Sequence, residues 1–436
     1  MAVYGYFFLV CWLYRYVRLI INCVSHWTFR PIPLPDEPTL GSQDVTIIIP
    51  TIDGDNEELR ATIRSCLRTE PFEIILVTTD AELKRADKMV QAMSTSRIRV
   101  LSIARANKRR QMCRAIPEVL TEITVFADDD VEWPPRILEW MLAPFEDPGY
   151  GGVGTCQRLK RVKCPDLSTR IWNFLGAIYL ERRNFDISAT SHIDGGIPCL
   201  SGRTVAYRTQ ILQDPAFTYG FTHEVWFNTY QLNADDDNFI TRWIFMHQWK
   251  TYIQYCKEAE LTTTLEDNSK FIKQCLRWSR SNWRSNLTSM IIDRSVWTKQ
   301  PWSAYAVQIT TITQWAFLSD VTMVWLLYKA TEDSSQCLRN IAFVAMISWM
   351  VLSKFIKLIG HFIRYPEDVW LWPISPIFGY LHGLLKLYAA FTLHETAWGS
   401  RAGADTDDEY RMIPIESRMS AEMARSSMES NKPLMG

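Results

Sequence analysis

Short apolar runs alternate with helical stretches over residues 45–127, and this alternation restricts the possible folds more than any other feature of the sequence. The runs are rich in Ile, Val and Thr, which is typical of buried strands, and the stretches between them have helical spacing. Strand–helix–strand units of this length predict an α/β fold with a parallel sheet that binds ligands at the carboxyl ends of its strands. The predicted strands are 45–51, 73–78, 98–103 and 123–127, and the predicted helices are 56–67, 81–93 and 108–120.

A long apolar segment, residues 4–24, lies near the N-terminus and contains Arg15 and Arg18 as its only charged residues. About 20 apolar residues are enough to cross a bilayer. No small-residue cleavage site follows the segment, which argues against a removable signal peptide. We therefore predict a membrane anchor or transmembrane helix within residues 1–30. Because two arginines are costly in mid-membrane, an anchor that lies in the interface stays open as an alternative.

Three more apolar, aromatic-rich segments follow residue 300, at 303–328, 341–363 and 370–391. Each is long enough to span the hydrocarbon core of a membrane. A buried bundle of a soluble domain is the alternative, but three such runs in succession exceed what a soluble domain needs. We therefore predict an α-helical transmembrane region of about three segments within 303–400. The polar tail 402–436 has no periodicity and is predicted to be disordered.

Composition excludes some classes of partner. With 47 Lys and Arg against 48 Asp and Glu, the net charge is −1, so no global basic field indicates nucleic acid. The ten cysteines form no CxxC pair and no compact framework, so we expect reduced thiols and no thiolate metal site. The 18 tryptophans suit a membrane interface or a sugar-binding groove, and they suit a Trp-rich core equally well.

Three adjacent carboxylates, Asp128, Asp129 and Asp130, follow directly on the predicted strand 123–127. Carboxylates this close repel one another and favour a bound cation. Hard oxygen ligands suit Mg²⁺ or Mn²⁺, and such ions typically bridge one or two carboxylates to substrate phosphates. The metal would act as a Lewis acid on a departing nucleoside diphosphate. The alternative interpretation is a solvated acidic turn.

A second acidic triplet, Asp235, Asp236 and Asp237, lies in the segment NADDDNFIT. General-base catalysis needs one carboxylate near an acceptor hydroxyl, held apart from the metal ligands. An acidic first turn of a helix, favoured by the helix dipole, explains the same residues. Taken alone, the triplet favours this helix-end interpretation.

The motif Q-x-x-R-W is formed by Gln274, Arg277 and Trp278, just before the first C-terminal apolar segment. The guanidinium of Arg277 can pair with a diphosphate, and Trp278 offers a face on which a sugar ring can stack. The same stretch is also predicted to lie as a basic helix on a membrane surface, because Arg277, Arg280 and Arg284 can extend to lipid headgroups.

In this combination the motifs resemble those of processive family-2 glycosyltransferases, which include hyaluronan, cellulose and chitin synthases, and most of all the fungal and bacterial capsule-type polysaccharide synthases. That family orders its motifs as a first strand with an acidic nucleotide contact, D-x-D, [TGS]-[ED]-D and Q-x-x-R-W, followed by transmembrane helices. The ordered set spans roughly residues 40–400 and is far more specific than any single motif. The matching segments are PTID (50–53), VTTD (77–80), DDD (128–130), ADDD (234–237) and QCLRW (274–278).

The resemblance implies a role for each matching residue. Nucleotide-sugar contacts fall on Asp53, Asp80, Lys108, Asp128 and Arg277, and the ligands of Mg²⁺ or Mn²⁺ on Asp128 and Asp130. Asp237 becomes the catalytic base, with Asp236 as the alternative if the triplet is registered one residue earlier. Acceptor contacts fall on Gln274, Trp278, Ser201 and Gly202, the last two within a CLSGR segment (199–203) similar to the family's C-x-SG. Trp398–Arg401 is similar to the family's end motif.

The resemblance also implies an architecture and an activity. A GT-A-like α/β domain with an interfacial helix would occupy residues 40–300 on the cytosolic side of the cell membrane, joined to the multi-pass region 303–400. The enzyme would transfer a hexose, with inversion, from a UDP-sugar to a growing extracellular or cell-wall polysaccharide. A non-processive glycolipid enzyme like the ceramide glucosyltransferases is the alternative. The intact carboxylate set argues against a third possibility, an inactive membrane scaffold or transporter. The sequon at Asn286 should stay unmodified if this segment is cytosolic.

Overall fold

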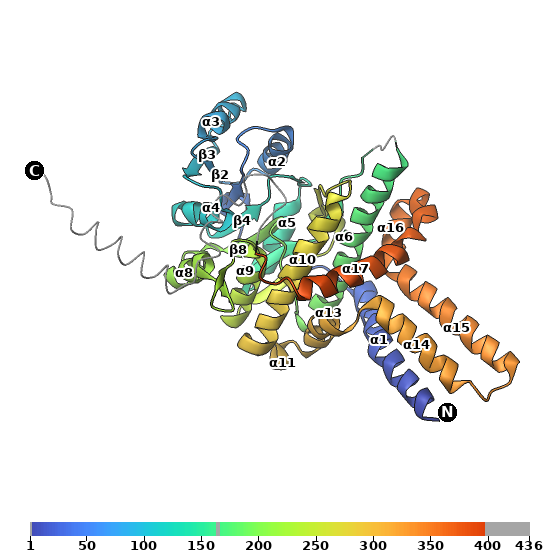
Figure 1. Cartoon of the computed structure of the whole chain (residues 1–436). Helices are drawn as coiled ribbons and strands as arrows, with labels where there is room; N and C mark the ends of the chain where they lie inside the picture. Colours follow the sequence, from blue (N-terminus) through green and yellow to red (C-terminus); the bar gives the residue numbers. More distant parts are fainter. Residues whose placement is uncertain (1, 163–165, 397–436) are drawn as a thin grey trace, which may run out of the picture.

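The computed structural model describes residues 2–162 and 166–396 of the chain. An α/β domain carries a group of projecting helices, and the N-terminus lies at the far tip of these helices (Figure 1). The predicted tail 402–436 and the end motif Trp398–Arg401 lie outside the described residues.

A mixed seven-stranded sheet forms the centre of the α/β domain, with the order β11-β6-β8-β4-β1-β2-β3. Only β8 runs antiparallel to its neighbours in this sheet. The chain passes from β1 outward to β3 and then returns to the other side of β1 with β4, so a topological switch point lies between β1 and β4. Open α/β sheets bind ligands at such points. The strands are β1 (Val45–Pro50), β2 (Glu73–Thr79), β3 (Ile98–Ile103), β4 (Ile123–Ala127), β6 (Tyr150–Thr155), β8 (Thr204–Arg208) and β11 (Lys250–Gln254).

The structure confirms the four predicted strands and the three predicted helices between them. The helices are α2 (Glu57–Leu67), α3 (Leu83–Ala92) and α4 (Lys108–Ala115). The side chains of Asn56 and Asn107 cap α2 and α4 by accepting hydrogen bonds from the backbone of Leu59 and Arg110. α4 ends five residues earlier than predicted, because Pro117 cannot continue the helical hydrogen bonding and lies in the short 3₁₀ turn η2 (Ile116–Glu118).

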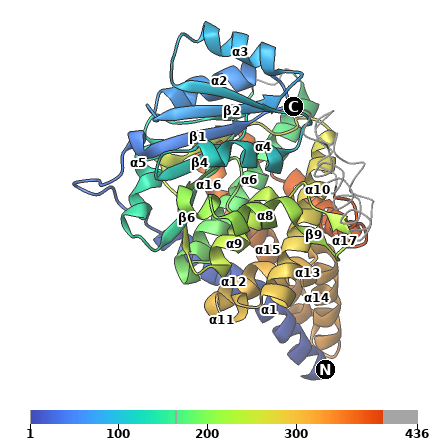
Figure 2. The same ribbon diagram turned by 90° about the vertical axis from the view of Figure 1, so that its left-hand side faces the viewer.

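Apolar clusters cover both faces of the sheet, as the alternation of side chains along a strand requires. Ile47 and Ile49 of β1 face a cluster that α2, α3 and α5 (Ile137–Leu142) complete, whereas Ile48 faces the cluster on the opposite side. That second cluster includes residues of α4, α8 (Pro215–His223) and α9 (Asp236–Met246), and Figure 2 shows α8 and α9 below β1, β2 and β4. Burial on both faces explains why the strand sequences are continuously apolar.

Two small sheets and a layer of helices complete the domain. The first sheet has the order β5-β12-β7 and consists of β5 (Val131–Glu132), β12 (Leu261–Thr263) and β7 (Gln157–Leu159). The second sheet pairs β9 (Val225–Trp226) with β10 (Tyr230–Gln231). A third apolar cluster joins the long helices α6 (Leu167–Asp194) and α10 (Lys270–Leu287) to α16 (Ile359–Arg364) and α17 (Ile374–Ala390). The remaining short helices are α7 (Thr209–Leu212), α11 (Val296–Lys299), α12 (Pro301–Ser303) and α13 (Thr310–Thr313).

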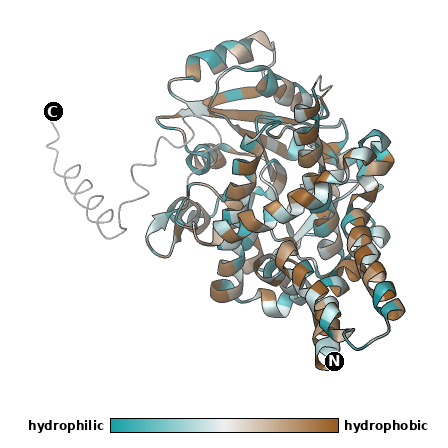
Figure 3. Ribbon diagram, turned by 45° about the vertical axis from the view of Figure 1, so that its right-hand side comes forward, coloured by the Kyte–Doolittle hydropathy of each residue, from teal (hydrophilic) through white to brown (hydrophobic). Residues whose placement is uncertain are grey.

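Three helices, α1 (Ala2–Thr28), α14 (Ala316–Ala330) and α15 (Gln336–Phe355), project side by side from the domain (Figure 1). Their outer faces are apolar and exposed, as the brown ribbon of Figure 3 shows; Val3, Val321 and Val344 are each about two-thirds exposed. Between the helices, an apolar cluster is accompanied by one charged group, in which Asp320 of α14 contacts Arg15 of α1 at 2.8 Å and Lys354 of α15 at 2.6 Å. Exposed apolar faces of this extent are unusual on a soluble domain.

Within the described ranges, two helical stretches are long and apolar enough to cross a membrane, Ala2–Thr28 and Gln336–Arg364. The predicted segment 303–328 is not one helix. It begins with the π-helical turn η6 (Ala304–Ile309) and breaks after α13, where Trp315 adopts an extended backbone and the side chain of Gln314 donates to the carbonyl of Tyr14. The predicted segment 370–391 corresponds to α17, which follows the turn η8 (Pro366–Leu371) and has 17 residues.

Candidate active site

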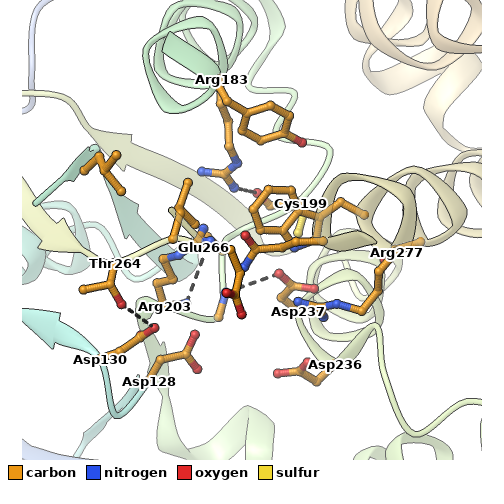
Figure 4. A pocket seen from close by; sticks show the side chains of 18 of the residues that line it. Asp128, Asp130, Arg183, Cys199, Arg203, Asp236, Asp237, Thr264, Glu266 and Arg277 are labelled. Carbon is orange, nitrogen blue, oxygen red and sulfur yellow. Dashed lines mark hydrogen bonds between the residues drawn. The ribbon is translucent and has the colours of Figure 1, made fainter. Parts of the chain in front are cut away.

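A cavity of about 490 Å³ opens beside the carboxyl end of β4, at the switch point of the sheet. Its walls come from segments far apart in the chain: both acidic triplets, the CLSGR segment, α6, the segment after β12, and α10. Figure 4 shows Asp128 and Asp130 on one side of this space, and Asp236, Asp237 and Arg277 on the other. The fold therefore brings together the three motifs that the sequence presents as separate.

The first triplet directly follows β4, and its side chains go to different places. Asp128 and Asp130 line the cavity, whereas Asp129 is buried and accepts a hydrogen bond of 2.7 Å from the hydroxyl of Thr51. Asp130 accepts another from the hydroxyl of Thr264 at 3.1 Å. In this turn between β4 and β5, the outer two carboxylates therefore face the ligand space and the middle one faces the protein.

The second triplet stands at the start of α9. Asp235 has a left-handed backbone (φ 64°) and forms a buried ion pair with Arg284, at 2.7 Å between Oδ2 and Nη2. Burial alone would raise the pKa of Asp235, but Arg284 lowers it below its ordinary value. Asp236 and Asp237 lie in the first turn of α9, and both line the cavity.

Lys108 connects the two triplets. Its ammonium lies 2.9 Å from Asp128 and 2.9 Å from Asp236. Burial alone would lower the pKa of Lys108, but the two carboxylates raise it above its ordinary value, so the side chain is charged. The sequence-predicted donor contact Lys108 is thus in the cavity, at the first helical position of α4.

Asp237 has surroundings of a different kind. Its Oδ2 accepts a hydrogen bond of 3.3 Å from the backbone N–H of Gly202, and the thiol of Cys199 also donates to it. Burial, together with the neighbouring carboxylate of Asp236, raises the pKa of Asp237, and Lys108 only partly opposes this. Gly202 lies so close to its neighbours that a larger residue would crowd them. A Cβ at this position would lie 3.2 Å from the Lys108 ammonium and 3.3 Å from Asp236.

The Q-x-x-R-W residues line the opposite wall from helix α10. Trp278 stacks on Tyr179 of α6, with 5.0 Å between ring centroids, and the guanidinium of Arg203 lies 5.4 Å from the Trp278 ring. Arg277 points toward Asp237 (Figure 4), and Gln274 and Ser201 also line the cavity. The prediction that α10 presents its arginines to lipid is wrong for Arg284, whose side chain is buried against Asp235.

Asp53 and Asp80 follow β1 and β2 at the same edge of the sheet, as parallel strands require. They do not line the cavity. Asp53 forms a partly exposed ion pair of 3.3 Å with Arg85, and Asp80 is exposed. The structure therefore places these two predicted nucleotide contacts beside the cavity and not within it.

Several residues of the cavity wall were not expected from the sequence. Tyr179 and Arg183 come from the middle of α6, which carries no recognisable motif, and Arg183 donates to the carbonyl of Cys199 at 3.0 Å. Glu266 and Asp267 follow β12. For these two, a signal existed: an acidic pair that follows two residues after the short strand LTT. For the α6 residues there was none.

Residues 2–162 and 166–396 contain no group of three or more His, Cys, Asp or Glu side chains arranged to hold a metal. Asp128 and Asp130 nevertheless suit a divalent cation, because they line the cavity and offer hard carboxylate oxygens. Mg²⁺ and Mn²⁺ are commonly held by one or two carboxylates, with substrate phosphates and water as the other ligands. The donor set therefore fits a metal that binds together with a nucleotide.

Comparison with known proteins identifies the family to which this chain belongs. Residues 42–281 match the family described as "Glycosyltransferase like family 2". The chain is also 55% identical over 420 residues to a type 2 glycosyltransferase of Zymoseptoria tritici, covering 95% of this chain and 88% of that protein. The chain therefore belongs to the family-2 glycosyltransferases, which transfer sugars from nucleotide-sugar donors.

More distant similarities agree with this assignment. A hyaluronan synthase of Streptococcus pyogenes is 22% identical over 373 residues, covering 82% of this chain and 83% of that protein. A solved structure, the mannosyltransferase PcManGT of Pyrobaculum calidifontis in complex with GDP-Man and Mn²⁺, aligns with a TM-score of 0.55 at 14% identity. It covers 90% of this chain and 99% of that one. This likeness confirms the GT-A-like fold.

Proposed function

We propose that this chain is a membrane-embedded, metal-dependent, inverting transferase that moves a sugar from a UDP-sugar to a growing extracellular polysaccharide. One observation carries the proposal: a single cavity draws together Asp128 and Asp130, Asp237, and Arg277 with Trp278. These are the groups that a metal–diphosphate, an acceptor hydroxyl and a sugar ring need.

The nucleotide-sugar donor would bind on the β4 side of the cavity. Asp128 and Asp130 would hold Mg²⁺ or Mn²⁺, which when bound neutralises charge on the diphosphate leaving group. Lys108 and Arg277 would bind phosphate oxygens from either side. Lys108 must then exchange its contact with Asp128 for one with the ligand. The PcManGT complex, which holds GDP-Man and Mn²⁺, supports a metal–nucleotide site in this fold.

Asp237 is the proposed catalytic base. A carboxylate with a raised pKa is a better proton acceptor than an ordinary one, and its contacts with Gly202 and Cys199 fix its position. It would take the proton of the acceptor hydroxyl as that oxygen attacks the anomeric carbon. The bond to the diphosphate breaks on the opposite side, so the anomeric configuration inverts. Asp236 is held by Lys108, which makes it the weaker candidate for this role.

Membrane embedding is supported by the projecting helices. α1, α14 and α15 expose apolar side chains outward and join Arg15, Asp320 and Lys354 inward, and Tyr380 of α17 donates to Asp320 at 2.8 Å. Charged residues in membrane helices face one another in this way. Asp320 thus joins α14 to α1 and α15.

The proposed acceptor is a polysaccharide. The Trp278–Tyr179 stack offers an aromatic surface at the wall of the cavity, where a sugar ring can rest after each transfer. The similarity to a hyaluronan synthase supports a polymer product. Membranes incubated with a panel of radiolabelled UDP-sugars, followed by sizing of the product, test this proposal, with Asp237→Asn membranes as the control.

We expect a labelled polymer or ladder. A single labelled glycolipid would show that the enzyme is instead a non-processive glycolipid glycosyltransferase. If no donor gives any labelled product, the proposal is overturned.

Glycosylation of the sequon at Asn286 is not a test of which side of the membrane the catalytic domain occupies. Asn286 is buried in α10, so it would stay unmodified on either side of the membrane. Cys337 is exposed and is the second residue of α15, and Figure 1 shows that α15 begins at the far tip of the projecting helices. If the catalytic domain is cytosolic, a membrane-impermeant maleimide should label Cys337 in intact cells, and Cys337→Ser should abolish this labelling. Labelling only after the cells are opened would reverse the proposed orientation.

A further inference from the structure

The short segment 199–202 is tied to Asp237 both through the carboxylate and through the backbone of this residue. The N–H of Gly202 donates to the Asp237 carboxylate at 3.3 Å. The N–H of Leu200 donates to the hydroxyl of Thr241 at 2.9 Å, and this hydroxyl donates in turn to the backbone carbonyl of Asp237 at 2.7 Å. We call residues 199–202 the base-holding segment.

Thr241 lies one helical turn after Asp237 in α9 and is only 4% exposed. A threonine hydroxyl has one proton and two lone pairs. Inside a helix it often donates its proton to the carbonyl four residues earlier, as Thr241 does to Asp237. A lone pair then remains for a second contact, and Thr241 uses it for Leu200. One buried hydroxyl therefore joins the helix that carries the proposed base to the base-holding segment.

Two further contacts fix the base-holding segment itself. The side chain of Leu200 is fully buried in the second apolar cluster, and a Cβ at Gly152 of β6 would lie 3.0 Å from its Cδ1. From the opposite side, the guanidinium of Arg183 on α6 donates to the carbonyl of Cys199 at 3.0 Å (Figure 4). The segment is thus held by the central sheet and by α6, so it gives the base a fixed reference.

These contacts determine how the carboxylate of Asp237 is turned. Its Oδ2 accepts from Gly202, and its Oδ1 accepts from the backbone N–H of Asn238 at 2.9 Å. One hydrogen bond to each oxygen restricts rotation of the carboxylate, while each oxygen keeps a further lone pair. Because Asp237 lines the cavity, a lone pair is available to an acceptor hydroxyl there. A base must lie within hydrogen-bond reach of the proton that it removes.

From this arrangement we infer that Thr241 and Arg183 are positioning residues of the transfer reaction, which hold the base-holding segment so that the Asp237 carboxylate is aimed at the acceptor hydroxyl. The inference rests on the proposed function, because both residues act through the proposed base. Neither residue has to touch the sugar for this role. The alternative is that the same hydrogen bonds contribute to stability alone.

The test compares variants of Thr241 that differ in the hydroxyl. Thr241→Val removes the hydroxyl at nearly constant shape, and Thr241→Ser keeps it. The matched control is Thr190→Val, because Thr190 of α6 is also buried and donates to the carbonyl of Asp186, four residues earlier, at 3.1 Å. Turnover is measured as UDP release by the purified full chain, with Mn²⁺ and a saturating mixture of UDP-glucose, UDP-galactose and UDP-N-acetylglucosamine. Titration of UDP with Mn²⁺ shows whether each variant is folded.

We expect Thr241→Val to lower turnover by about 10–100-fold with unchanged affinity for UDP, since a small displacement of a reacting group has an effect of this size. Arg183→Gln should act in the same way. Thr241→Ser and Thr190→Val should stay close to wild type. In the Asp237→Asn background, Thr241→Val and Arg183→Gln should cause no further loss, because residues that act through one group are not additive with its removal.

An equal loss from Thr241→Val in the wild-type and Asp237→Asn backgrounds would overturn the inference, and so would a loss in Thr241→Ser as large as that in Thr241→Val. If Arg183→Gln weakens UDP binding and leaves turnover unchanged, Arg183 contacts the ligand and is not a positioning residue. If Thr241→Val does not bind UDP, the same comparison of backgrounds is made with Arg183→Gln. The proposed function fails by a different result, in which Asp237→Asn releases UDP as fast as wild type.

Discussion

The two acidic triplets have identical side chains, yet the fold uses them in different ways. In 128–130 the middle carboxylate is buried against Thr51, and the outer two face the cavity. In 235–237 all three residues line the cavity, but the carboxylate of the first is buried in an ion pair with Arg284. The partners set this difference, because Thr51 binds the middle carboxylate of the first triplet and Arg284 binds the first carboxylate of the second. Each triplet thus divides into one carboxylate that holds the fold and two that face the ligand space.

This division predicts that substitutions at different positions of one triplet affect different properties of the protein. A cavity-facing carboxylate should affect ligand binding or turnover and leave stability unchanged. A buried carboxylate should lower stability and affect the reaction only indirectly.

Asp130→Ala should abolish metal-dependent binding of a UDP-sugar, because it removes one of two carboxylates available to the cation. Titration of UDP in the presence of Mn²⁺ measures this, with excess EDTA applied to wild type as the comparison. The unfolding temperature should not fall. Full activity in EDTA, or unchanged binding by the variant, would remove the metal site from the proposal.

Asp237→Asn should lower turnover by about 10²–10⁴-fold while nucleotide affinity is kept, since that is the usual contribution of a positioned base. Its stability should be equal or higher. The raised pKa of Asp237 means that folding disfavours its charged form, so an uncharged side chain costs the fold nothing. For the same reason, wild-type turnover should decline on the acid side at a higher pH than an ordinary aspartate would give. If Asp236→Asn lowers turnover more than Asp237→Asn does, the catalytic base is Asp236.

Asp235→Asn should lower the free energy of unfolding by about 3–5 kcal/mol, the cost of leaving one member of a buried ion pair alone. The pKa of Asp235 is lowered in the folded state, so its contribution is fully present above the ordinary carboxyl pKa and is lost as pH falls below it. Thermal unfolding of wild type and variant across this range measures both effects. A stable variant with lost turnover would contradict the division.

Asp129→Asn should have the smallest effect, about 1 kcal/mol, because an amide oxygen can still accept the hydrogen bond from Thr51. Thermal unfolding and UDP affinity together check this. If the variant instead loses metal-dependent binding as Asp130→Ala does, the middle carboxylate belongs to the ligand site.

The sequence by itself determined the α/β class, four of the seven central strands and the order of the motifs. These follow from local physics: β-branched runs such as VTIIIP form strands that are buried on both faces, and asparagines before α2 and α4 cap them. The motifs could be matched because their residue types are required by the chemistry of phosphate, metal and sugar.

Only the tertiary structure decided which carboxylate of each triplet faces the cavity, because that depends on partners far away in sequence. Thr51 is 78 residues from Asp129, and Arg284 is 49 residues from Asp235. The same holds for Tyr179 and Arg183, which become part of the site only when α6 packs against α10 and α17. A sequence pattern records the chemistry of a side chain, whereas its burial and its partners are set by long-range packing.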